Sequence, residues 1–209
     1  MVNAVYGAPQ RLTALAADLV NHWEGRREAM RPLISAPGKA LIVGATSEIC
    51  ARLYKQIIEL RPDWHSPELH QGRIKVVYSG DASDTELIGR HVRRESENAV
   101  IKERLRQVDD ELEIVIVKDM MLTGYDSPPL HTLYLDRPLK GALLMQTLAR
   151  VNRTFRQKNA GLLVVTRRWR TTCRRRCRNT PSATRRTSRW AGRRRTLSRW
   201  SASCWQRST

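Results

Sequence analysis

Short apolar runs alternate with segments of helical periodicity along the first 165 residues of this chain. The runs have the length and composition of buried strands, and they occupy residues 40–43, 74–78, 112–117, 132–135 and 162–165. Helical spacing and helix-start signals predict helices over residues 11–30, 46–60, 84–106 and 142–155. This alternation predicts an α/β fold, in which helices cover both faces of a parallel sheet.

Membrane and secretory signals are missing from the sequence. No run approaches the roughly 18 apolar residues of a membrane span, and the first residues lack a basic segment followed by an apolar one. The four cysteines are too few and too irregular for a disulfide framework, and Cys173 and Cys177 have no partners at zinc-finger spacing. We therefore expect a cytoplasmic protein with no membrane contact and no bound metal.

Positive charge is concentrated at the C-terminal end of the chain. The formal net charge is +18, yet residues 1–165 hold 23 Lys and Arg against all 20 Asp and Glu. Residues 166–209 hold 15 Arg, no Lys and no acidic residue, together with four of the six Trp. Taken literally, this tail is a disordered basic arm, with Arg for phosphates and Trp for stacking on bases.

The same tail composition is typical of a GC-rich gene that is translated out of frame. If the frame moves back by one nucleotide, the codons after residue 168 become compatible with Val-Ala-Asp-Asp-Leu-x-Ala-Ala-Leu-x-Glu-Tyr. That string has the pattern of an amphipathic helix. We interpret residues 166–209 as a disordered, frameshifted tail, and a genuine basic arm is the alternative.

A glutamine and two arginines share a helical spacing near the end of the predicted fold. Gln146, Arg150 and Arg153 lie at offsets of 0, 4 and 7, which places them on one face of the predicted helix. Guanidinium groups keep their proton and donate paired hydrogen bonds, so they suit a phosphate that gains charge during transfer. The alternative is an ordinary solvated helix whose arginines have no such role.

A Gly/Asp/Pro loop at residues 122–129 follows the third predicted strand, and a short strand separates it from the Gln/Arg helix. This order resembles motifs V and VI of superfamily 2 helicases. The strings Leu-Thr-Gly-Tyr-Asp-Ser-Pro and Gln-Thr-Leu-Ala-Arg-Val-Asn-Arg are similar to those of one family in particular. They resemble the second RecA-like motor domain of the R subunit of type I restriction enzymes, over about residues 12–165.

The resemblance implies a nucleotide-facing set of residues. Arg150 and Arg153 would act as arginine fingers towards the γ-phosphate of ATP, with Gln146 assisting at the same face. Asp126 would line the nucleotide cleft, and Gly124 would allow the tight turn before it. We expect this turn at the carboxyl end of its strand, where ligands meet open α/β sheets. A plain turn between strands is the alternative.

A second set of residues would face DNA if the resemblance holds. Thr123 would touch the DNA backbone. Thr46 and Ser47 resemble motif IV, where the free N–H groups at a helix start can hold a DNA phosphate. An ordinary helix cap is an equal alternative for these two residues.

Parts of a complete motor are missing from the chain. Residues 37–40 read Pro-Gly-Lys-Ala, with Ala where a phosphate loop needs Ser or Thr for Mg²⁺, and no nuclease carboxylate cluster can be recognised. We therefore expect a fragment of the ATP-dependent DNA translocase of an R subunit. ATP and Mg²⁺ would be used in the intact subunit, and neither would be bound by the fragment alone.

The expected partners follow from the resemblance. They are double-stranded DNA, the first motor domain and nuclease of the R subunit, and the modification and specificity subunits. The expected organisation is an N-terminal helix and linker (1–38), a second RecA-like domain (39–165) and the Arg-rich tail (166–209). Two other functions stay open: a fragment of another superfamily 2 ATPase, or a basic nucleic-acid-binding module.

Overall fold

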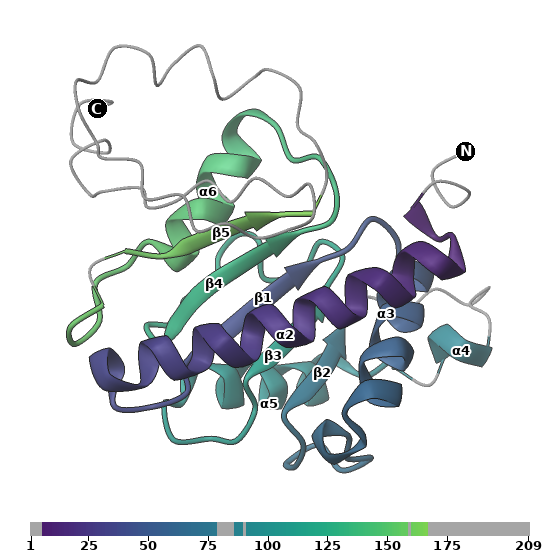
Figure 1. Cartoon of the computed structure of the whole chain (residues 1–209), viewed down its shortest axis with the longest axis horizontal. Coiled ribbons are helices and arrows are strands. Elements are labelled where there is room, and N and C mark those ends of the chain that lie inside the picture. Colours follow the sequence, from purple (N-terminus) through teal and green to yellow (C-terminus); the bar gives the residue numbers. More distant parts are fainter. Residues whose placement is uncertain (1–5, 79–85, 90, 159, 167–209) are drawn as a thin grey trace.

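The computed structural model describes residues 6–78, 86–89, 91–158 and 160–166. Within them a five-stranded sheet forms the centre of the molecule (Figure 1), with the strand order β2-β3-β1-β4-β5. All neighbouring strands are parallel. The strands are β1 (Lys39–Val43), β2 (Ile74–Val77), β3 (Ile114–Val117), β4 (Leu130–Leu135) and β5 (Leu162–Val165). The α/β fold with a parallel sheet is confirmed.

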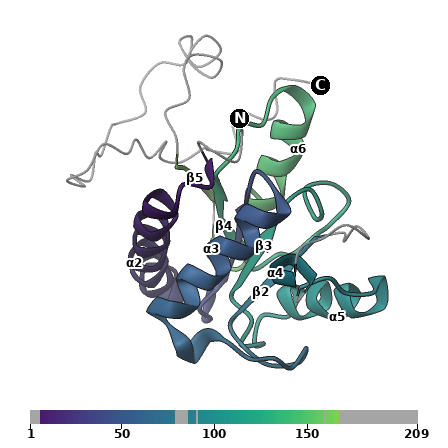
Figure 2. The ribbon, with the colours of Figure 1, turned by 90° about the vertical axis from the view of Figure 1, so that its right-hand side faces the viewer.

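Helices cover both faces of the sheet, as the two views at right angles show (Figures 1 and 2). One face carries α2 (Pro9–Ile34) and α3 (Ser47–Leu60), and the other carries α5 (Glu95–Arg106) and α6 (Gly141–Val151). The remaining helical elements are the short α4 (Glu86–Gly89) and the 3₁₀ turn η1 (Pro62–Trp64). In the described residues, no helix is both long and apolar enough to cross a membrane.

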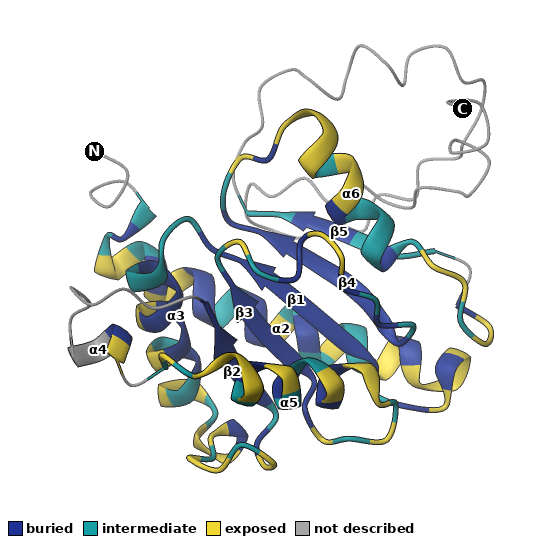
Figure 3. Cartoon of the chain, turned by 180° about the vertical axis from the view of Figure 1, so that it is seen from behind, coloured by how far each residue is buried: buried dark blue, intermediate teal, exposed yellow. Residues whose placement is uncertain are grey.

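Successive strand residues point to opposite faces and therefore belong to two separate cores. In β1, Ala40 and Ile42 pack with α2 and α3, whereas Leu41 and Val43 pack with α5 and α6. Both sides of every strand are thus covered, and the strands are buried almost along their whole length (Figure 3). This double burial explains why the strands read as continuous apolar runs in the sequence.

The α2 helix extends beyond its predicted bounds at both ends, and its last turn includes Pro32. Its C-terminal side chains Met30 and Ile34 are buried, so packing carries the helix into the segment predicted as a linker. Trp23 joins the helix to the sheet, since its ring stacks on that of His131 at 5.3 Å between centroids. Its Nε1 also donates a hydrogen bond to Glu113 Oε2 at 3.0 Å.

The helical region predicted over residues 84–106 is interrupted. Two helices, α4 and α5, occupy the described part of this range, and Arg94 between them is extended (φ −65°, ψ 156°). The Glu97 carboxylate accepts a hydrogen bond from the Arg94 backbone N–H at 2.8 Å, which starts a new helix there. The proposed starting residues of the predicted helix and the tail beyond residue 166 lie outside the described residues.

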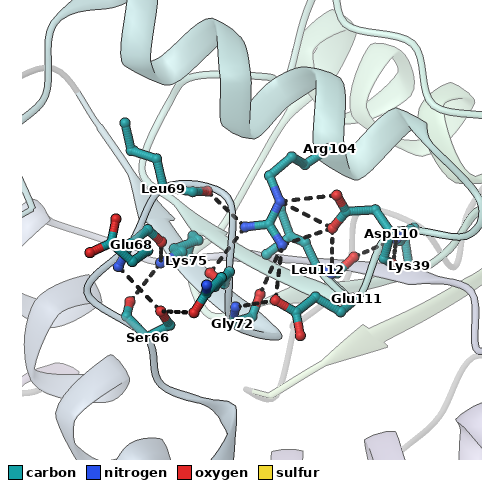
Figure 4. A network of polar contacts seen from close by, with 11 residues as sticks. Lys39, Ser66, Glu68, Leu69, Gly72, Lys75, Arg104, Asp110, Glu111 and Leu112 are labelled. Carbon is teal, nitrogen blue, oxygen red and sulfur yellow. Dashed lines mark hydrogen bonds and ion pairs between the residues drawn. The ribbon is translucent and has the colours of Figure 1, made fainter.

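Buried polar groups connect the loops at the amino ends of the strands (Figure 4). The Arg104 guanidinium contacts the Asp110 carboxylate at 2.8 Å and the Leu69 carbonyl at 2.8 Å. Lys39 donates to the Asp110 carbonyl at 2.6 Å, and Lys75 donates to the Ser66 carbonyl at 2.7 Å. Burial lowers the pKa of each of these lysines to about 8. Backbone carbonyls that no strand or helix uses are satisfied in this way.

Candidate functional site

Asp126 and Arg153 form an ion pair between the 122–129 loop and the chain that follows α6. Arg153 Nη1 lies 2.7 Å from Asp126 Oδ2, and the two side chains are 49% and 40% exposed. A pair this exposed adds little to stability, because water and salt screen it. The structure thus brings together one residue from each of the two segments that the sequence singles out.

The 122–129 loop is fixed to the last turn of α5 by hydrogen bonds around Asp126. Tyr125 Oη donates to the Lys102 carbonyl at 2.9 Å, and Ser127 Oγ donates to the Leu105 carbonyl at 2.8 Å. Arg106 Nε donates to the Asp126 carbonyl at 3.1 Å. The Leu105 carbonyl belongs to the last turn of α5 and has no partner inside the helix, so the bond from Ser127 satisfies it. Burial raises the pKa of Tyr125 and keeps its hydroxyl a donor.

Gly124 has a left-handed backbone conformation (φ +70°), which a residue with a side chain rarely adopts. The turn is where the sequence predicts one, but the loop continues across the face of the sheet. Asp126 lies beside the C-terminal end of α5, and Pro129 and Leu130 lead directly into β4. Asp126 therefore lies towards the amino ends of the strands, whereas the sequence predicts the Gly124 turn before it at the carboxyl end of β3.

The helix predicted to carry Gln146, Arg150 and Arg153 ends at Val151. Gln146 is exposed on α6 and Arg150 is half-buried on its last turn, whereas Arg153 lies two residues beyond the helix. The three side chains therefore do not share one continuous helical face. Among the described residues, Arg150 Nε and Asp126 Oδ1 are shielded from water and have no hydrogen-bond partner.

Two of the three residues expected to face DNA lie at the start of α3, and the third lies in the 122–129 loop. Thr46 is extended and caps α3, because its Oγ1 accepts a hydrogen bond from the Ile49 N–H at 3.2 Å. Ser47 is the first residue of that helix, which begins after the carboxyl end of β1. Thr123 is exposed in the loop before Gly124. The cap and the Asp126–Arg153 pair are thus at opposite ends of the parallel strands.

Lys158 is a residue of this site that sequence reasoning missed. It is 1% exposed, and its Nζ donates to the carbonyls of Pro128 at 3.0 Å, Leu130 at 2.8 Å and Val151 at 3.4 Å. Burial lowers its pKa to about 8, and the Arg153 charge acts in the same direction. Lys158 lies in a polar segment before β5, and nothing in the sequence around it indicates that its side chain is buried.

Known proteins resemble this chain in sequence. Residues 90–168 match the family described as type I restriction enzyme subunit R domain 3. The type I restriction enzyme HindI endonuclease subunit of Haemophilus influenzae is 44% identical over 161 residues, which are 76% of this chain and 15% of that protein. A second relative is a protein of Methanocaldococcus jannaschii described as a putative type I restriction enzyme MjaIXP endonuclease subunit. It is 34% identical over 154 residues, which are 73% of this chain and 13% of that protein.

Two solved structures align with this chain at low sequence identity. T4 UvsW aligns with a TM-score of 0.46 and 15% identity, over 74% of this chain and 24% of that one. Domain 2 of the DEAD-box helicase Mss116p, solved with an RNA duplex, aligns with a TM-score of 0.41 and 17% identity. That alignment covers 75% of this chain and 49% of the solved one.

The resemblance to R subunits of type I restriction enzymes is therefore confirmed, and residues 90–168 match domain 3 of that family. Both motifs on which the resemblance rests, at residues 122–129 and 146–153, lie within the matched segment. The protein is similar to the HindI subunit of Haemophilus influenzae over three quarters of its own length, and it spans about one seventh of that relative.

Proposed function

We propose that this chain supplies one half of the ATP site and part of the DNA track in the motor of a type I restriction enzyme R subunit. The observation that carries the proposal is the Asp126–Arg153 pair, with Arg150 on the adjacent helix end. Arg153 is exposed enough to reach a ligand on a facing domain, and the carboxylate beside it orders the guanidinium until that ligand arrives.

In this proposal Arg153 and Arg150 stabilise the charge that develops on the γ-phosphate of ATP, and Gln146 assists from α6. ATP and Mg²⁺ are held mainly by a preceding motor domain, so this chain acts only when that domain faces it. Asp126 lines the nucleotide cleft, with Gly124 shaping the loop. DNA would meet Thr46 and Ser47 at the other end of the sheet and Thr123 in the 122–129 loop, and translocation would couple these contacts to the nucleotide.

A chimera tests the proposal. The aligned segment of the Haemophilus influenzae subunit is replaced by the matching segment of this chain, and DNA-dependent ATP hydrolysis is measured with the partner subunits present. The chimera should hydrolyse ATP, and Arg153→Ala should lower kcat by roughly 10³-fold or more, as for other arginine fingers, with DNA binding retained.

Arg61→Ala is the matched control for Arg153→Ala. Arg61 also pairs with a carboxylate at 2.7 Å, that of Glu24, and both partners are 38% exposed. It lies at the end of α3, in a segment to which the resemblance assigns no role at the nucleotide. Equal ATP hydrolysis by the chimera and its Arg153→Ala variant would refute the role of this arginine, whereas an equal loss in both variants would indicate general damage.

A further inference from the structure

We infer that Lys158 is a positioning residue, which sets the distance and angle between Asp126 and Arg153. Its ammonium group has three N–H donors and contacts three backbone carbonyls, those of Pro128, Leu130 and Val151. The functional side of this inference rests on the function proposed above, since it concerns the same pair of residues. The geometric side can be tested without ATP.

The three carbonyls belong to both halves of the site. Pro128 follows Asp126 by two residues, and Val151 precedes Arg153 by two residues. Two residues of chain span at most about 7 Å, so a shift of either carbonyl passes directly to the charged side chain. Leu130, the first residue of β4, ties both segments to the sheet. One buried ammonium therefore joins the 122–129 loop, the sheet and the end of α6.

The backbone around Lys158 holds its side chain in this place. Phe155 and Lys158 exchange two backbone hydrogen bonds, at 3.3 and 2.9 Å, in a tight turn with Arg156 at positive φ. The Gln157 N–H donates to the Leu33 carbonyl at 3.1 Å, which fixes the turn to the end of α2. The turn thus has its own support and does not depend on the contacts that Lys158 makes.

The ammonium group also suits the end of a helix. Val151 is the last residue of α6, and its carbonyl is one of those without a partner inside the helix. A positive charge is favoured at this end of the helix dipole. Gly161 lets the Val151 carbonyl approach, because a Cβ at this glycine would lie 2.3 Å from the oxygen. Two features of the sequence, Lys158 and Gly161, therefore place the same carbonyl.

Lys75 provides a matched control for Lys158. It is 2% exposed, its Nζ donates to the carbonyls of Ser66 and Glu68 at 2.7 and 2.6 Å, and burial lowers its pKa to about 8 as well. It belongs to β2, at the opposite edge of the sheet from β5. Its replacement removes a buried lysine of the same kind without touching either half of the site.

The test follows the Arg153 side chain by ¹⁵N NMR in the full chain. The Nε–H signal is assigned by its loss in Arg153→Lys, and Asp126→Asn gives the signal of the unpaired guanidinium. Lys158→Met should move the Arg153 signal towards its position in Asp126→Asn, whereas Lys75→Met should leave it in place. Lys158→Arg keeps the charge, but its planar fork does not match three carbonyls, so a smaller shift in the same direction is expected.

An Arg153 signal that stays at its wild-type position in Lys158→Met would overturn the inference. If circular dichroism shows that Lys158→Met is unfolded, Lys158→Arg decides in its place by the same criterion. In the chimera, Lys158→Met should lower kcat by up to about 100-fold, with KM for ATP unchanged, because misplacement of a catalytic group by about 1 Å has this effect. A shifted signal with unchanged kcat would support the positioning role and refute the proposed function of the pair in ATP hydrolysis.

Discussion

Gly161→Ala should destabilise the protein and disturb the site, because the added methyl group meets the end of α6. An ideal Cβ at this position lies 2.3 Å from the Val151 carbonyl oxygen and 2.5 Å from its carbon. Ordinary contact begins at 3.4 Å, so the two backbone segments must separate by about 1.1 Å, the difference between 3.4 and 2.3 Å. Backbone on both sides leaves no flexible side chain that could yield.

The magnitude follows from two effects. Overpacking of a well-packed site costs about 1–3 kcal/mol. The displaced Val151 carbonyl also weakens its hydrogen bond to Lys158, whose net contribution is on the order of 1 kcal/mol or somewhat more because the donor is charged. We therefore expect the free energy of unfolding to fall by about 2–4 kcal/mol in Gly161→Ala.

Gly25→Ala is the control, and it should have the opposite sign. Gly25 lies within α2, and a Cβ there meets nothing within 4 Å. Alanine is favoured over glycine inside a helix by roughly 1 kcal/mol, so this variant should be more stable than the parent. Urea unfolding followed by circular dichroism measures both variants. If Gly161→Ala is as stable as Gly25→Ala, the close approach at Val151 does not exist in solution.

Three shorter predictions follow. Lys39 has its pKa lowered to about 8 by burial, so the unfolded chain binds this proton more tightly than the folded one between about pH 8 and 10.5. The free energy of unfolding should therefore rise with pH in that window, and Lys39 contributes at most about 1.4 kcal/mol per pH unit to this rise. Urea unfolding at pH 8 and pH 9 should show a smaller rise for Lys39→Met than for the parent protein. Equal slopes would contradict this assignment. The purified chain should not turn over ATP in a coupled assay, since the sequence lacks a phosphate loop, and DNA-stimulated hydrolysis by the chain alone would disprove the half-site proposal. Removal of residues 167–209 should leave the thermal unfolding midpoint unchanged if they are out-of-frame product, and should abolish any steeply salt-dependent DNA binding; a lower midpoint would mean that they pack on the domain.

Much of the fold could be predicted because strands and helices leave local patterns. All five strands were predicted within two residues at each end, since each is buried on both faces and reads as an apolar run. A cap at Thr46 or Ser47 was one of two alternatives that the sequence left open, and Thr46 is the residue that caps α3, because a side-chain oxygen before a helix start is a local signal. The sequence did not predict that Asp126 pairs with Arg153. It showed only that both residues belong to motifs that resemble the same family.

Other features depend on contacts between distant segments. The break between α4 and α5 and the early end of α6 at Val151 do not follow from residue spacing alone. The helix α6 ends where its last carbonyl meets Lys158, seven residues further on, and where Gly161 lets β5 pass close by. Helical periodicity carries no information about these neighbours, so it extends the helix too far.

The sequence by itself thus determined the α/β class, the strands, Thr46 and Ser47 as the two candidate caps of α3, and the family that the two motifs resemble. Each rests on a short-range pattern, in which burial or a local hydrogen bond selects residues a few positions apart. Only the tertiary structure decided the strand order, the position of Asp126 towards the amino ends of the strands, and the role of Lys158. The physical reason is that a buried charge is stable only where several backbone carbonyls converge on it, and that convergence exists only after the chain has folded.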